Sequence, residues 1–294
     1  MTASLDNDGA ARRLLMWRTE SLFQDPERRR CAREWTHLRF SRLPYAREPG
    51  VVVSDLSGRM PFANGGFEAV YAFHIHEHLG PDDGLRVLRD MHRVLTPGGV
   101  CRVSTPDLAF YAEEYLLGLR ALGANAGERE AVIHEWALLN LIDQTARRTP
   151  GGKMAEALAA GRVDADHLRH LNGDSLATMF SSRASKPPSR RPRTLHGAPA
   201  TDPRFIVSSL AANAARRLIH RLSPGLFLRW SFENNRWLYD LPSLTRTMEL
   251  AGFRDVRAHT WATSDIPGWA RYDFDRSPLG DYALEPSLYV EGMK

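Results

Sequence analysis

The sequence predicts an α/β fold built on a mostly parallel sheet, and two observations support that prediction. Residues 67–73 form an aromatic and β-branched run, which is typical of a strand buried on both faces. After a loop, apolar residues recur at helical spacing over 85–95, and Pro97-Gly98-Gly99 then leads into a second apolar strand at 100–104. A strand, a helix and a strand in this order form a βαβ unit, which favours parallel strands joined by a right-handed crossover.

The remaining elements are predicted from propensity and spacing. Strands are expected at 35–40, 51–54, 256–261 and 287–291. Asp82 and Asp83 are expected to open the helix that follows residue 80, since acidic side chains favour a helix N-terminus. Further helices are expected at 107–125, 128–146, 205–222 and through 244–250, where Gly252 stops the last one. The helix at 107–125 is predicted to bury an apolar stripe of Phe110, Tyr111, Tyr115 and Leu116.

Length and composition limit the class of protein. A chain of 294 residues suits one large domain, or one domain with an insertion. No apolar run approaches the roughly 20 residues of a membrane span, and residues 1–11 lack the apolar core of a secretory signal. Cys31 and Cys101 are not in a Cys-x-x-Cys spacing, so neither a zinc site nor a disulfide framework is expected. This cysteine usage predicts a cytoplasmic protein, and the lack of a long apolar run predicts no membrane partner.

The middle of the chain departs from the α/β pattern. Residues 126–232 are expected to form a helical insertion between two parts of one α/β domain, residues 1–125 and 233–294. The insertion is interpreted as a lid, or as the contact with a second copy or a partner protein. Its basic stretch, residues 181–204, is rich in Pro and Ser. That composition favours a solvated loop over a nucleic-acid contact.

In an open α/β sheet, ligands lie beyond the carboxyl ends of the strands, so candidate site residues are sought there. Asp55, followed by Leu56, comes directly after the strand at 51–54. A carboxylate accepts hydrogen bonds only, so Asp55 is a candidate partner for an amino group such as that of adenine. The alternative is that Asp55 caps a turn.

A histidine-rich segment follows the strand at 67–73. On an extended strand, His74, His76 and His78 would share one face, and imidazole binds zinc or iron. His78 is also a candidate general base, because the pKa of histidine lies near neutrality. The alternative is a structural hydrogen bond that shapes the loop.

The ordered set of motifs resembles the class I S-adenosylmethionine-dependent methyltransferases, and in particular a bacterial subgroup of methyltransferase type 11. Members carry a strand ending in His-x-x-Glu-His-Leu, then a helix, then Arg-Val-Leu-x-Pro-Gly-Gly and a strand ending in Pro. The matching residues here are His74, Glu77, His78, Leu79, Arg93, Val94, Leu95, Pro97, Gly98, Gly99 and Pro106. The resemblance covers roughly residues 35–118 and 236–294, and leaves the insertion unassigned.

The resemblance implies a seven-stranded Rossmann-like sheet in the order 3-2-1-4-5-7-6, with the strand at 287–291 antiparallel. It also implies S-adenosylmethionine as cofactor, with Asp55, Leu56 and His74 in contact with it, and a small-molecule acceptor. The family pattern carries no metal at its histidines, so no metal is expected.

The chain departs from the family in two places. The glycine-rich loop expected before Trp35 corresponds to residues 25–33, which contain no glycine. The acid expected at the end of the next strand, where it would bind the ribose, is replaced by Arg39, and a guanidinium cannot accept a hydrogen bond. Three explanations stay open: a rearranged loop that still binds S-adenosylmethionine, a more anionic ligand held by Arg39 and its neighbours, or loss of cofactor binding.

Overall fold

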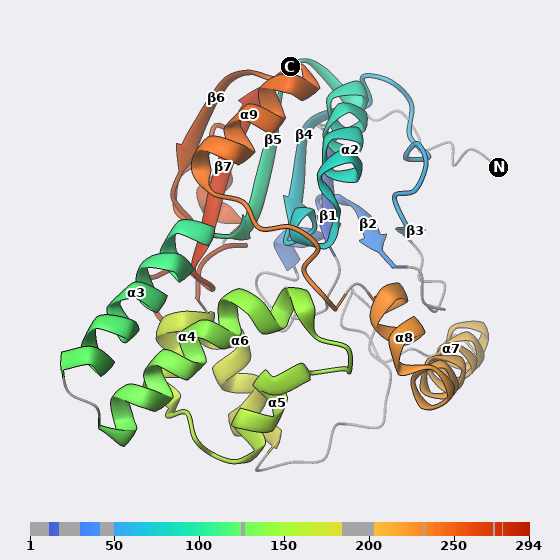
Figure 1. Cartoon of the computed structure of the whole chain (residues 1–294). Helices are drawn as coiled ribbons and strands as arrows, with labels where there is room; N and C mark the ends of the chain where they lie inside the picture. The colour runs from blue at the N-terminus through green and yellow to red at the C-terminus, as the bar shows by residue number, and fades with distance from the viewer. Residues whose placement is uncertain are drawn as a thin grey trace.

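A seven-stranded mixed sheet forms the centre of the protein, in the order β3-β2-β1-β4-β5-β7-β6 (Figure 1). The structure, a computed structural model, describes residues 12–17, 30–41, 50–124, 127–183, 203–231, 233–272, 274–277 and 279–294. The strands are β1 (Arg13–Trp17), β2 (Thr36–Phe40), β3 (Val51–Ser54), β4 (Phe67–Phe73), β5 (Leu95–Pro106), β6 (Arg254–His259) and β7 (Ser287–Met293). β1 to β5 pair in parallel, and β7 runs antiparallel between β5 and β6. The predicted strand order and the antiparallel last strand are therefore confirmed.

The predicted βαβ unit is β4, α2 (Pro81–Val94) and β5. Pro81 begins the helix and the two aspartates lie in its first turn, so the helix starts slightly earlier than predicted. β5 begins at Leu95 and includes the Pro-Gly-Gly sequence, where the register with β4 shifts. A Cβ on Gly99 would lie 3.0 Å from the carbonyl oxygen of Glu68, so this close approach of two backbones favours glycine.

Each face of the sheet has its own hydrophobic core. α2 and α9 (Leu241–Ala251) cover one face, where Val87, Leu88, Leu244 and Met248 pack against the strands. A capping box at Asp240 begins α9, and the left-handed Gly252 ends it as predicted. The other face is covered by residues 266–284, whose buried side chains are mostly aromatic. This second cover includes Trp269 of the short helix η3 (Trp269–Arg271).

Helices lie beyond the carboxyl ends of the parallel strands (Figure 1). They are α3 (Leu108–Ala124), α4 (Glu128–Ala146), α5 (Gly152–Ala159), α6 (Ala165–Arg183), α7 (Pro203–Leu222) and α8 (Pro224–Ser231). α3 to α6 share a separate core that includes Trp136, Met154 and Leu171. Among the described helices, none has the length and apolarity required to cross a membrane.

The predicted stripe on α3 is only partly correct. Tyr111 is buried, but Leu116 is 44% exposed. α3 packs mainly against α4, and the close approach is made at Gly118, whose added Cβ would lie 3.1 Å from the backbone of His134. The packing of α4 therefore determines which face of α3 is covered. Helical spacing alone does not identify that face.

We expect Gly173→Ala to destabilise the fold by about 2 kcal/mol, because alanine tolerates neither the backbone angle nor the space. Gly173 interrupts α6 with a φ of +70°, and a Cβ there would collide with the carbonyl oxygen of Leu284 and lie 2.8 Å from Cα of Glu285. Urea unfolding followed by circular dichroism measures the change. Gly123→Ala is the control: its Cβ would meet nothing within 4 Å, so a small stabilisation is expected. Equal stability of the two variants would contradict the account.

Candidate functional site

The carboxyl ends of the four strands β1 to β4 meet at one edge of the sheet. In the register of the sheet, Trp17 is opposite Arg39, which is opposite Val53, and Met16 is opposite Ala72. The residues that follow these strands therefore lie beside one another. The strand order reverses between β1 and β4, which is where open α/β sheets bind ligands.

Asp55 and Leu56 form a tight turn at the end of β3. One carboxylate oxygen of Asp55 accepts hydrogen bonds from the backbone N–H of Ser57 at 3.1 Å and from its hydroxyl at 2.7 Å. Leu56 has a φ of +54° and its side chain is buried in the core, while Arg86 donates to its carbonyl oxygen at 2.6 Å. The turn cap considered for Asp55 is thus present, and it fixes the carboxylate at the carboxyl edge of the sheet. Contact of Asp55 and Leu56 with a cofactor stays a prediction.

His74 directly follows β4 and is held from both sides. Its φ is +48°, a left-handed conformation that non-glycine residues rarely adopt. Nδ1 lies 3.2 Å from the Glu77 carboxylate, and Nε2 lies 3.1 Å from the hydroxyl of Ser287 and 3.8 Å from Glu285. Burial lowers the pKa of His74, but the two carboxylates outweigh burial and raise it to about 9. At neutral pH His74 is therefore a cation at the carboxyl edge of the sheet.

Glu77 is the buried anion of this group. Its carboxylate lies between His74 and His78, whose Nε2 is 3.7 Å away, and Thr105 donates to it at 3.4 Å. Burial raises the pKa of Glu77, but the two histidines together lower it to about 2. Because Nδ1 of His78 lies 3.2 Å from the carbonyl oxygen of Asn234, which can only accept, that nitrogen is the donor. The predicted catalytic role of His78 is untested, and its buried position between two partners suits a structural bond.

The histidines do not share a strand face, contrary to the geometry considered for a metal site. β4 ends at Phe73, and residues His76–His78 form the short 3-10 helix η2. His76 points into the interior, where burial lowers its pKa to about 4 and keeps it neutral. The three rings therefore have different surroundings, and the extended-strand argument for a shared metal fails.

Arg39 lies at the carboxyl end of β2, as predicted, and its guanidinium is 4.7 Å from the centre of the Trp17 ring. Both side chains are buried. Trp17 Nε1 donates to Nδ1 of His37 at 3.2 Å, and the other ring nitrogen of His37 lies 2.8 Å from the carbonyl oxygen of Ala32. The position expected to hold a ribose-binding acid is thus occupied by a cation stacked on an aromatic ring.

The segment expected to hold the glycine loop must be placed differently from the sequence prediction. β1 ends at Trp17, so the segment that corresponds to the loop begins at residue 18, whereas residues 30–32 are helical and precede β2. Residues 18–29 lie outside the described residues. Their sequence contains no glycine, so the absence of the motif holds at the corrected position as well.

Residues 233–240, which we call the strap, cross the carboxyl edge of the sheet. Their place at this edge was not predicted from the sequence. The backbone N–H groups of Arg236 and Trp237 donate to the carbonyl oxygen of Glu77 at 2.6 and 3.1 Å. Asn235 donates to the carbonyl oxygen of Gln144 in α4 at 2.8 Å. The strap thus ties η2 to the helices beyond the sheet. These are backbone contacts between distant segments, which no local sequence pattern signals.

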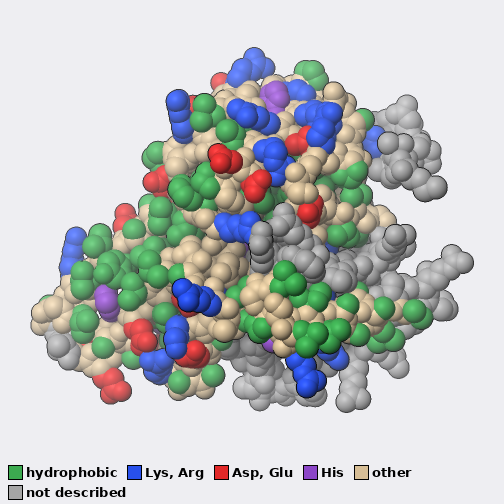
Figure 2. Space-filling model, turned by 45° about the vertical axis from the view of Figure 1, so that its right-hand side comes forward, with side chains coloured by type: hydrophobic (Ala, Val, Ile, Leu, Met, Phe, Trp, Pro, Cys, Tyr) green, Lys and Arg blue, Asp and Glu red, His purple; other side chains and the backbone are tan. Residues whose placement is uncertain are grey.

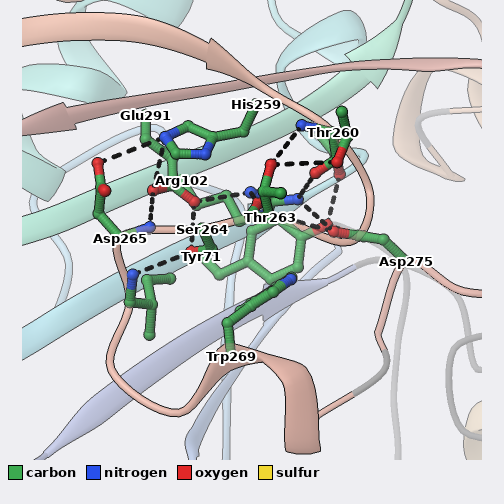
Figure 3. Close-up of polar contacts among 12 residues, drawn as sticks. Tyr71, Arg102, His259, Thr260, Thr263, Ser264, Asp265, Trp269, Asp275 and Glu291 are labelled. Carbon is green, nitrogen blue, oxygen red and sulfur yellow. Dashed lines mark hydrogen bonds and ion pairs between the residues drawn. The ribbon is translucent and has the colours of Figure 1, made fainter.

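A separate polar cluster lies around Arg102 of β5 (Figure 3). Arg102 is fully buried and binds Asp275 at 2.8 Å and Glu291 at 2.6 Å. It also donates to the carbonyl oxygens of Thr260 and Thr263, both at 3.0 Å. Burial lowers the pKa of Arg102, but Asp275, Tyr71 and Glu291 together outweigh burial and raise it, so the guanidinium stays charged. This cluster joins β5 and β7 to the segment that covers the sheet.

At the edge of this cluster, His259, Asp265 and Glu291 bring one potential ligand atom each within 4.8 Å of one another. Nε2 of His259 lies 3.3 Å from Asp265 and 3.4 Å from Glu291. Both carboxylates already bind arginines, since Arg257 is 2.6 Å from Asp265. We interpret the group as an ion-pair network, and the absence of a metal cofactor stays a prediction.

The His74 cation predicts a pH dependence of stability. Its pKa is raised from 6.5 to about 9 on folding, so its contribution is complete below pH 6.5 and is lost as the pH rises through about 9. The shift corresponds to roughly 3 kcal/mol. His76, with its folded pKa near 4, is neutral in the folded state over this window, and its slope of opposite sign ends about one pH unit above the unfolded pKa of 6.5. We expect urea unfolding of the wild type to show this loss between pH 6.5 and 9.

The control for this prediction is His74→Asn, because asparagine tolerates the left-handed conformation and does not titrate. The variant is expected to be less stable at pH 6.5 and nearly insensitive to pH up to 9. The same loss of stability in the variant and the wild type would show that another group causes it.

Comparisons with known proteins give one family match and several similar solved structures. Residues 25–103 match the family described as a methyltransferase domain. Solved structures with a similar chain course include PigF with SAH, at 10% identity and a TM-score of 0.36 over 96% of this chain and 50% of that one. Another is an S-adenosylmethionine-dependent methyltransferase from Mesorhizobium loti, at 12% identity and a TM-score of 0.36 over 99% and 94%.

The chain spans about half the length of PigF. The comparison with curated proteins found no match. The family match extends from the segment before β2 to within β5, and the strand order is the one that the family resemblance implied. Residues 25–103 are thus similar to a methyltransferase domain, within a sheet that has the strand order of the class I methyltransferase fold.

Proposed function

We propose that the protein transfers a methyl group from S-adenosylmethionine to a small-molecule acceptor at the carboxyl ends of β1 to β4. The observation that supports this most is the methyltransferase-domain match over residues 25–103, which contains β3, β4 and the turns after them. Asp55 and His74 lie in those two turns, at the edge where the strand order reverses.

The residues present fit the cofactor on one side of this edge. Asp55 offers a carboxylate acceptor, which suits the amino group of adenine. When bound, S-adenosylmethionine supplies a methyl group activated by a sulfonium. The β2 end fits less well, because Arg39 offers donors where a ribose needs an acceptor.

The acceptor is proposed to be small because helices and the strap cross the carboxyl edge of the sheet (Figure 1). We propose that residues 126–232 form the insertion that encloses it. In this setting the chain's own residues act mainly by positioning the acceptor and excluding water. His74 is protonated at neutral pH, so we propose that it contributes a positive charge that helps to orient the ligands, and that it does not act as a base.

A second candidate function has its own support. The missing glycine and the Arg39 cation on Trp17 favour a protein that has kept the fold and lost methyl transfer, either as a partner subunit or for another ligand. An anionic ligand would suit Arg39, since guanidinium is a preferred partner of phosphate and carboxylate groups.

Calorimetric titration with S-adenosylmethionine and with S-adenosylhomocysteine separates the two candidates. Methyl transfer predicts binding of both ligands, with a rise in melting temperature that grows with ligand concentration. No heat and no thermal stabilisation at millimolar ligand would contradict the first candidate. Binding of both ligands would contradict the second candidate in its non-binding form.

A further inference from the structure

The helix α7 presents an apolar face to solvent, which is the reverse of the arrangement expected for a helix on a soluble domain. Val207 is 66% exposed, Leu210 62%, Leu218 56% and Leu222 73%. At 100° per residue these four side chains fall within one third of the helix circumference. Ser209, on the other side, is buried. An apolar stripe of this kind indicates a binding surface.

The position of α7 makes this surface accessible. α7 and α8 lie at one side of the molecule, away from the sheet (Figure 1), and α8 is the described element that packs most closely against α7. Hydrophobic side chains gather over this region in the space-filling view, with Lys and Arg side chains below them (Figure 2). The apolar stripe is therefore on a convex helix and not in a groove.

The charge around the stripe is of one sign. α7 contains Arg204, Arg216, Arg217 and Arg221, and residues 203–222 include no Asp or Glu. Arg217, His220 and Arg221 are exposed. At 100° per residue, Arg217 lies at one edge of the stripe and Arg221 lies within it, next to Leu210. An exposed apolar stripe next to cations suits a binding surface whose outer layer is anionic and whose interior is apolar.

We propose that α7 docks the protein on an anionic lipid surface, with its apolar stripe in the interface and its arginines on the headgroups. A second copy of the chain fits less well. A contact between two α7 helices would bring their arginines together, and α7 has no acidic residue to pair with them. A convex helix about 30 Å long also matches a flat surface better than a protein groove. Such docking is peripheral, in keeping with the lack of a spanning helix among the described residues.

Vesicle co-sedimentation tests the proposal with the full chain. The wild type is expected to sediment with vesicles in which phosphatidylglycerol replaces part of the phosphatidylcholine, and to remain in solution with phosphatidylcholine alone. Added salt is expected to weaken the binding, because the headgroup attraction is screened. No binding to either vesicle would overturn the proposal.

Two variants and one matched control locate the surface. Leu218→Asp and Leu222→Asp are expected to weaken vesicle binding at least tenfold, since each places a charge in the interface. Leu117→Asp is the control, because Leu117 of α3 is 54% exposed, close to the 56% of Leu218, on a different helix. The three substituted leucines are all exposed, so none of the variants is expected to unfold, and circular dichroism checks this.

The outcomes discriminate among the occupants of the surface. Loss of vesicle binding in Leu218→Asp but not in Leu117→Asp supports the proposal. Equal binding of all variants would overturn it. If the wild type sediments in the ultracentrifuge as a dimer that Leu218→Asp dissociates, and binds no vesicle, the surface belongs to a second copy and the proposal fails. None of these results depends on methyl transfer.

Discussion

Replacing Arg102 by methionine is expected to lower the free energy of unfolding by about 4 kcal/mol, a large part of the 5–15 kcal/mol typical of a domain. The change leaves Asp275 and Glu291 buried without their cationic partner, and both are at most 1% exposed. It also removes the donors to the carbonyl oxygens of Thr260 and Thr263. Urea unfolding followed by tryptophan fluorescence measures the loss.

The matched control is Arg257→Met, which breaks an ion pair of the same length, 2.6 Å to Asp265, but on a side chain that is 55% exposed. Surface pairs of this kind contribute less than about 1 kcal/mol, so a small effect is expected. Arg102→Lys should fall between the two, because it keeps the charge and loses the planar fork. A loss below that of Arg257→Met would contradict the role of Arg102.

Replacing Asp55 by serine is expected to weaken S-adenosylmethionine binding about 10- to 100-fold, the range of a hydrogen bond to a charged group. Serine offers a hydroxyl that can keep the turn to Ser57, but it lacks the carboxylate acceptor. Calorimetric titration measures the change. Because the side chain is small and the turn is kept, little change in melting temperature without ligand is expected.

Asp166→Ala serves as the control for this titration, since the side chain of Asp166 in α6 is 95% exposed and forms a surface ion pair with Arg169. Its affinity for S-adenosylmethionine is expected to equal that of the wild type. Equal affinity of Asp55→Ser and the wild type would remove Asp55 from the cofactor site.

Much of the sheet could be predicted because its strands carry local signals. The aromatic run of β4, the valines of β3 and the helix between β4 and β5 all follow from residue type and spacing. The order of the strands came from the family resemblance, and the register of β5 with an antiparallel β7 confirmed it. The helix α4 also has the predicted bounds.

The first strand was not predicted, because the glycine-rich loop that follows this strand in the family was expected at residues 25–33. Arg13–Trp17 has only five residues, and the sequence after it, residues 18–29, contains no glycine that would have marked its end. The strand is recognised in the structure by its pairing with both β2 and β4. A short buried strand without a turn signal cannot be told from a helix fragment by its sequence.

The partners of the site residues were beyond prediction for a different reason. His74 was a candidate from its place after β4, but Ser287 lies 213 residues later in the chain. The raised pKa of His74 depends on Glu285, which the antiparallel strand β7 brings to the same edge. Such contacts are set by tertiary packing, and no spacing within one segment encodes them.

A crystal structure of the protein with S-adenosylhomocysteine tests the central claim most directly. We expect the ligand to bind at the carboxyl ends of β1 to β4. Its adenine should lie within hydrogen-bonding distance of Asp55, and its homocysteine end should lie beside His74. An empty edge at saturating ligand, or the ligand bound at another place on the molecule, would contradict it.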